Sequence, residues 1–108
     1  MHMNPVERQV DAYNAHDLDA FVACYTDDIL ISDGAGAVLV AGREEMRKEF
    51  ATLFESSPKL HAEVVGRLDA GAYVVLNERI EGYGGDPIDG IMVYHVAEDA
   101  IDRAIWLI

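Results

Sequence analysis

The chain has 108 residues, a length typical of one domain, and about half of its residues are apolar. Its 20 acidic and 8 basic residues give a net charge of −12. Binding to nucleic acid or to an anionic membrane surface requires clustered Lys and Arg, so this charge argues against both kinds of partner. The single cysteine, Cys24, excludes a disulfide within the chain.

The N-terminal sequence and the hydropathy both favour the cytoplasm. The first residues, MHMNPVE, lack the basic and apolar regions of a secretory signal peptide. No apolar run approaches the roughly 18 residues that a membrane-spanning helix needs. We therefore expect a cytoplasmic protein with one domain over residues 1–108.

Two helices are predicted in the first quarter of the chain. Asn4 can cap the first helix, Pro5 suits its first position, and Glu7 lies three residues after the cap. Apolar residues then recur at helical spacing at Val6, Val10 and Tyr13. This helix is expected to end near residues 14–16, and Asp17 can cap a second one. The apolar face of the second helix carries Leu18, Phe21, Val22 and Tyr25.

The next part of the chain predicts two short strands and a third helix. The polar residues 26–28 interrupt the helical pattern, and residues 29–32 are typical of a strand. Asp33 and Gly34 then indicate a turn, which a second strand at residues 38–40 follows. A helix from residue 43 to about residue 55 has its apolar stripe at Met46, Phe50, Leu53 and Phe54.

The second half of the chain predicts four long strands. They cover residues 60–68, 72–80, 88–96 and 101–108, and turn residues separate the strands of each hairpin. Helices segregated from a run of antiparallel strands indicate an α+β fold. We expect a cone: a strongly curved antiparallel sheet with three helices packed on its concave face, enclosing a pocket.

One carboxylate interrupts an otherwise apolar strand face. Because side chains alternate between faces, Ala72, Val74, Leu76 and Ile80 share a face with Glu78. An ionised carboxylate buried there without a partner would cost several kcal/mol, so Glu78 is paired, neutral or at a wet cavity. The alternative is that the strand bends and Glu78 reaches solvent.

Both faces of the predicted sheet carry apolar residues. On the last strand Ala104 and Trp106 share one face, and Ile105 and Leu107 share the other. One face is expected to cover the helices, which leaves the other for a partner. A homodimer is the natural expectation for such a sheet in an acidic protein.

Two segments resemble a known superfamily. The run NAHDLDAF at residues 14–21, followed by YTDDI at residues 25–29, resembles the opening of nuclear transport factor 2-like proteins, and more narrowly of SnoaL-like and ketosteroid-isomerase-like proteins. The segment AGREEM at residues 41–46 resembles the entry to their third helix. The resemblance covers essentially the whole chain and implies a cone with an apolar pocket. It does not imply one activity, because this fold hosts several enzymes and also binding domains.

The resemblance implies roles for several residues. In ketosteroid isomerase an Asp moves a proton between two carbons, while a Tyr and a protonated Asp donate hydrogen bonds to the substrate oxygen. Asp33 falls at the position of the base, Gln9 at that of the Tyr, and Met92 on or near that of the second donor. Tyr13 lies one helical turn after Gln9 and is a substitute donor. Trp106 corresponds to an inward-pointing position.

Other interpretations of these residues stay open. Asp33 precedes a glycine, which is a common turn signal. Gln9 and Tyr13 are alternatively helix-packing residues, and Trp106 is alternatively part of the core or of a dimer interface. The four histidines, at positions 2, 16, 61 and 95, have no recognised metal-ligand spacing, so no metal site and no cofactor are expected.

Two functions of different class follow. The first is a steroid delta-isomerase-like, cofactor-free enzyme that transfers a proton on a small apolar carbonyl compound. Asp33 is its base, and Gln9, Tyr13 and Glu78 contact the substrate within apolar walls. Those walls comprise Phe21, Met92 and Trp106. The second is a dimeric ligand-binding or association domain without chemistry. A third case is a dimer whose pocket is filled by its own bulky side chains, Tyr25 and Tyr94 among them.

Overall fold

The computed structural model describes residues 4–107, and within that range it contains three helices and one six-stranded sheet. The helices are α1 (Pro5–Ala15), α2 (Leu18–Val22) and α3 (Arg43–Ser56). The strands are β1 (Tyr25–Asp33), β2 (Val38–Ala41), β3 (His61–Ala70), β4 (Tyr73–Glu81), β5 (Ile88–Ala97) and β6 (Ala100–Leu107). His2 and Ile108, both considered from the sequence, lie outside the described residues.

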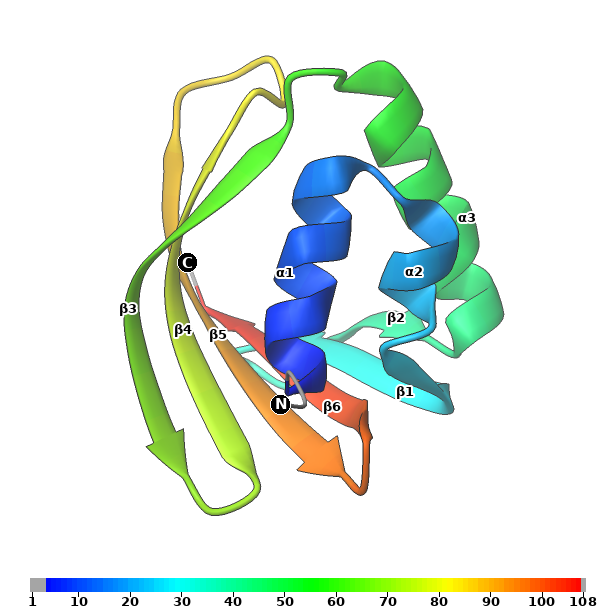
Figure 1. Ribbon diagram of the computed structural model, residues 1–108, viewed down its shortest axis with the longest axis vertical. Coiled ribbons are helices and arrows are strands. Elements are labelled where there is room, and N and C mark those ends of the chain that lie inside the picture. The colour runs from blue at the N-terminus through cyan, green and yellow to red at the C-terminus, as the bar shows by residue number, and fades with distance from the viewer. Residues whose placement is uncertain (1–3, 108) are drawn as a thin grey trace.

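The sheet curves around α1 and is not closed into a barrel. Its strand order is β2-β1-β6-β5-β4-β3. Figure 1 shows α1 inside the curve of the long strands, with α2 and α3 packed beyond it. This confirms the expected α+β cone. One pair differs from the antiparallel expectation, because β1 and β6 run parallel. Helix α3 and strands β2 to β5 lie between these two strands in the chain, which leaves enough length for a parallel pairing.

Helix α1 begins as the sequence predicts and is tied to the sheet. The Asn4 side chain accepts a hydrogen bond from the Val6 amide at 2.8 Å, and Pro5 opens the helix. Near its end, the Asn14 side chain donates to the Ala62 carbonyl at 2.9 Å and accepts from the Ala62 amide at 2.7 Å. This two-way bond on β3 fixes the depth at which α1 enters the cone.

Strand β1 is longer than expected and begins at Tyr25. The sequence pattern had placed Tyr25 on the second helix, and that prediction was wrong. Helix α2 ends at Val22 because the chain pairs with β6 from Cys24 onward, where the Cys24 carbonyl accepts from the Ile101 amide at 2.9 Å. Exposed Asp27 and Asp28 are tolerated in the strand because they lie outside the core. Tyr25 itself is almost fully buried.

The two faces of the sheet have different roles. Opposed residues in β4, β5 and β6 share a face, so Leu76, Met92 and Trp106 point toward the helices. The opposite, outer face is also apolar, and its exposed residues are Tyr73, Ile91, Ile105 and Leu107. None of the helices between residues 4 and 107 has the length and apolar character needed to cross a membrane.

Gly82 follows β4 directly and lies at the end of the β3–β4 hairpin that is opposite the turn, next to the residues that precede β3. Its φ is +85°, and a Cβ atom there would lie 1.9 Å from the Lys59 carbonyl oxygen. Gly36 has a similar φ of +90° but no atom within 4 Å of such a Cβ. An alanine at either position is strained by the positive φ, but only an alanine at position 82 also clashes. Comparing the two substitutions therefore isolates the effect of the clash.

We predict that Gly82→Ala lowers the free energy of unfolding by about 2 kcal/mol more than Gly36→Ala does, because only the first forces the chain away from Lys59. Urea denaturation of the two variants measures this difference. Equal destabilisation would show that the close approach of residues 59 and 82 is not required by the fold.

Candidate active site

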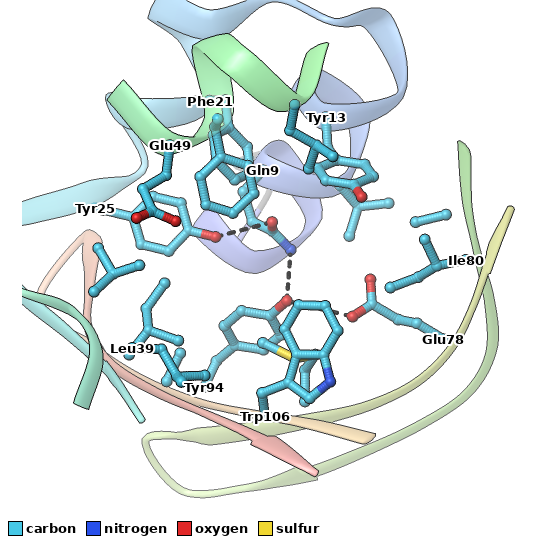
Figure 2. A pocket seen from close by; sticks show the side chains of 18 of the residues that line it. Gln9, Tyr13, Phe21, Tyr25, Leu39, Glu49, Glu78, Ile80, Tyr94 and Trp106 are labelled. Carbon is cyan, nitrogen blue, oxygen red and sulfur yellow. Dashed lines mark hydrogen bonds between the residues drawn. The ribbon is translucent and has the colours of Figure 1, made fainter. Parts of the chain in front are cut away.

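A cavity of about 460 Å³ lies between the concave face of the sheet and helices α1 and α3. Most of its lining is aromatic or aliphatic, with a few polar groups. Figure 2 shows these groups: Gln9 and Tyr13 from α1, Tyr25 from β1, Glu78 from β4 and Tyr94 from β5. A cavity of this size and character is typical of small-molecule sites.

Glu78 projects into this cavity and is 6% exposed. Its neighbours on the same face of β4, Leu76 and Ile80, are also buried, as the alternation predicted. Gly90 lies opposite Glu78 on β5, and because glycine has no side chain, it leaves room beside the carboxyl group. The alternative in which Glu78 bends out to solvent therefore does not hold.

Burial changes the acidity of Glu78. Desolvation disfavours the charged form and raises the pKa of Glu78 to about 7, against a smaller lowering by a hydrogen bond from Tyr94. The Tyr94 hydroxyl donates to Glu78 Oε2 at 3.5 Å, which is long for such a bond. Glu78 is therefore divided between its acid and its carboxylate at neutral pH.

A chain of hydrogen bonds leads to Glu78 across the cavity. The Tyr25 hydroxyl donates to Gln9 Oε1 at 3.0 Å, and Gln9 Nε2 donates to the Tyr94 hydroxyl at 3.2 Å. Figure 2 marks these bonds together with the contact from Tyr94 to Glu78. Burial also raises the pKa of Tyr25 and of Tyr94, which keeps both as donors. Every donor in the chain points toward the carboxyl group.

Tyr13 has a hydroxyl that is available to a ligand. It lines the cavity and has no hydrogen-bond partner among residues 4–107. Burial, with a smaller contribution from the charge of Glu78, raises its pKa, so the hydroxyl remains protonated. In Figure 2 this hydroxyl and the Glu78 carboxyl group face the same space. Tyr13 can therefore donate to an oxygen held near Glu78.

Asp33 lies outside this cavity. Its carboxylate accepts hydrogen bonds from the amides of Ala35 and Ala37, both at 2.9 Å, in the turn between β1 and β2. This is the turn arrangement that the sequence left as the alternative to a base. Asp33 lines a separate surface hollow, and Trp106 and Leu39 stand between that hollow and the cavity because they line both.

The remaining candidate residues line the cavity together. Gln9, Phe21, Met92 and Trp106 all do so. Gln9 has one hydrogen bond to a tyrosine at each end of its amide group, and it so orients Tyr94. The Trp106 Nε1 atom is buried without a partner among the described residues.

Two tyrosines and one glutamate of the lining were not among the site residues expected from the sequence. Tyr94 shares its strand face with Met92, as alternation predicts, but the sequence offered it only as bulk that could fill the pocket. Tyr25 was expected on a helix and was likewise offered only for its bulk, so its hydrogen bond to Gln9 was not foreseen. Glu49 precedes Phe50 on α3 and lies at the rim of the cavity. It is an exposed acidic residue on a helix, and nothing in the sequence distinguishes it from the other acidic residues of that helix.

No group of three or more potential metal ligands occurs among residues 4–107. His95 instead pairs with Asp102 at 2.6 Å outside the cavity. His16 contacts the Leu60 carbonyl at 2.8 Å and stacks on Phe54.

Known proteins resemble the chain in sequence and in structure. The model of the SnoaL-like domain family matches residues 6–104. An uncharacterized cystatin-fold protein of Novosphingobium aromaticivorans is similar with a TM-score of 0.90 and 28% identity, over 99% of this chain and 100% of that one. A SnoaL-like protein of unknown function from Burkholderia thailandensis has a TM-score of 0.78 and 26% identity, over 94% and 88%. No curated protein matches the sequence.

A third similar structure is known with a small molecule. It is a protein of Catenulispora acidiphila with a ketosteroid isomerase-like fold, in complex with trimethylamine. Its TM-score is 0.76 and its identity 17%, over 100% of this chain and 87% of that one. At this identity the similarity shows the shared fold alone.

The raised pKa of Glu78 links stability to pH. Between about pH 4.5 and pH 7 the folded chain keeps a proton on Glu78 that the unfolded chain releases, so stability falls as the pH rises through this window. We predict that Glu78→Gln removes this loss and is more stable than the wild type by on the order of 3 kcal/mol above pH 7, with little difference below pH 4.

Urea denaturation of both proteins across this pH range measures the effect. Glu55→Gln is the matched control, because Glu55 lies exposed on α3. A parallel pH dependence of the wild type and Glu78→Gln would contradict the burial of this carboxyl group.

Proposed function

Because the chain belongs to the SnoaL-like domain family, and because its cavity holds a buried carboxyl group, we propose that it is a cofactor-free enzyme that transfers a proton. Its substrate is a small apolar carbonyl compound, and Glu78 is the base. The observation that carries this proposal is the position of Glu78. It is the one charged residue between positions 4 and 107 that is buried, and it lies at the cavity wall.

The reaction follows from the groups around the cavity. The Glu78 carboxylate takes a proton from the carbon next to the carbonyl group, and the electrons of that C–H bond form the enolate. The Tyr13 hydroxyl donates a hydrogen bond to the enolate oxygen. The resulting Glu78 acid then returns the proton to the same carbon or to a conjugated one, so the enzyme ends in its starting state.

The acidity of Glu78 suits this task. A base works best at neutral pH when its pKa lies near 7, since it is then available as a carboxylate and still binds a proton readily. Burial brings the pKa of Glu78 to about 7. The long contact from Tyr94 leaves the carboxyl group free to engage a substrate. Asp33, by contrast, is held by two turn amides.

The alternative is a ligand-binding domain without chemistry. The same cavity would serve it, and the fold alone does not separate the two functions. The Catenulispora protein of this fold is known in complex with trimethylamine, so a protein with this fold can bind a small organic molecule. The two functions differ in whether Glu78 turns over a substrate.

The expected homodimer and cytoplasmic location also remain proposals. The exposed side chains of Tyr73, Ile91, Ile105 and Leu107 on the outer face of the sheet support self-association. No residue of that face is needed to complete the cavity.

We predict that the wild type converts cyclohex-3-en-1-one into its conjugated isomer, because Glu78 moves the proton between the two carbons. The absorbance of the conjugated enone measures the rate. The rate constant kcat/KM should rise with pH through an apparent pKa near 7, as Glu78 loses its proton. Glu78→Gln should lose about 100-fold or more in kcat.

Asp33→Asn is the matched control, because it removes the carboxylate that lies in the turn instead of the cavity. It should retain turnover. If Asp33→Asn lost turnover while Glu78→Gln kept it, the assignment of the base would be wrong. If neither the wild type nor the variants exchanged substrate protons for deuterium in heavy water, the binding domain would be the better account.

A further inference from the structure

The charged residues of the cavity wall are all acidic. Glu49 from α3 and Glu78 from β4 line the cavity, and no Lys, Arg or His between residues 4 and 107 does so. Figure 2 shows the two carboxyl groups on opposite sides of the space. Neither forms an ion pair with a described residue. The wall therefore offers negative charge that nothing within this part of the chain neutralises.

The basic residues of α3 are directed elsewhere. Arg43 pairs with Asp27, and Arg47 pairs with Asp19 at 2.6 Å. These four residues lie outside the cavity lining, although Glu49 belongs to the same helix. The helix thus keeps its positive charges on the outer surface and presents an unpaired carboxylate at the cavity rim.

Aromatic rings form much of the remaining wall. They are Tyr13, Phe21, Tyr25, Phe50, Tyr94 and Trp106. Several of them contact one another, with ring centroids 4.7 Å apart for Phe21 and Phe50 and 5.3 Å apart for Phe21 and Tyr25. The faces of aromatic rings carry negative potential and attract organic cations, most strongly where water is excluded.

We propose that the ligand of this cavity carries a positively charged amine or quaternary ammonium group on an apolar body. Two carboxylates without cationic partners attract such a group, and the aromatic walls accept both its charge and its hydrocarbon surface. An anionic ligand would meet repulsion on both sides. This inference rests on the proposed function in using the same cavity, and it deepens that function by naming a cationic carbonyl compound as the substrate class.

A positive nitrogen would also assist the proposed proton transfer. The enolate that forms carries negative charge, and among residues 4–107 the cavity wall supplies no cation to balance it. A substrate that bears its own positive charge would stabilise that enolate internally. Charge balance in the reaction and charge balance in the cavity thus point to the same class of molecule.

The test compares two probes of equal shape, phenyltrimethylammonium and tert-butylbenzene, which differ in a charged nitrogen or a neutral carbon. Trp106 is the only tryptophan of the chain and lines the cavity, so its fluorescence reports occupancy. At about pH 8, where Glu78 is ionised, the wild type should bind the ammonium probe about tenfold or more tightly than the neutral one. Equal affinity, or tighter binding of the neutral probe, would overturn the proposal.

Variants separate the cavity from the general charge of the protein. Glu78→Gln should reduce the preference for the ammonium probe at least severalfold and leave the affinity for tert-butylbenzene unchanged. Glu55→Gln removes a surface charge of α3 and should change neither affinity. If Glu55→Gln lowered the ammonium affinity as much as Glu78→Gln, the probe would be responding to net charge and the inference would fail.

A pH titration gives a second measurement on the unaltered chain. Groups that face Glu78 are Tyr13 of α1, Tyr25 of β1 and Tyr94 of β5, whose raised pKa values keep them neutral, and Glu49 of α3 lies across the cavity. The preference for the ammonium probe should shrink as the pH falls below 7. A preference independent of pH would contradict the role of Glu78.

The outcomes also separate this inference from the proposed function. Isomerisation of cyclohex-3-en-1-one without any preference for the ammonium probe would retain the enzyme and overturn the cationic substrate. A clear ammonium preference that depends on Glu78, without proton transfer, would retain the ligand class and overturn the chemistry.

Discussion

The burial of one carboxyl group in an apolar cone is the constraint around which the site is built. A charged group in such surroundings loses its hydration, so Glu78 is ionised with difficulty and its pKa rises to about 7. The fold accepts this cost where a strand of otherwise well-packed residues could have carried another apolar side chain. A structure that keeps a costly group at a cavity wall is typical of a functional site.

The cost is partly offset by groups from three other elements of the fold. Tyr25 of β1, Gln9 of α1 and Tyr94 of β5 form a directed series of hydrogen bonds that ends at Glu78 of β4. Because each of these side chains is buried, each needs a partner, and the series satisfies them together. The position of α1 within the cone is set in turn by Asn14 and its two bonds to β3. The site therefore depends on the docking of the helix as much as on the strands.

The two candidate bases, Asp33 and Glu78, show that the same fold can place a cavity carboxyl group on different strands. Asp33 and Glu78 both belong to strands of the same sheet, but Asp33 ends β1 and turns its carboxylate to the amides of the next loop. Glu78 lies within β4 on the concave face. A cone offers inward positions on every strand, so a carboxyl group can enter the cavity from a different strand than the resemblance implied.

Much of this protein followed from the sequence by itself. Local signals identified the cap of α1 at Asn4, the apolar stripes and the long strands, because capping and periodicity act over a few residues. Alternation also placed Glu78 on the apolar face of its strand, and the structure shows that this face lines the cavity. The extent of β1 was decided by its pairing with β6, some 70 residues later in the chain, which no local pattern could reveal. Likewise, only the tertiary structure decided that Asp33 faces a turn, because the side-chain direction at a strand end depends on the loop that follows. The partners of Glu78 come from segments far apart in the chain, so its acidity is a property of the folded molecule.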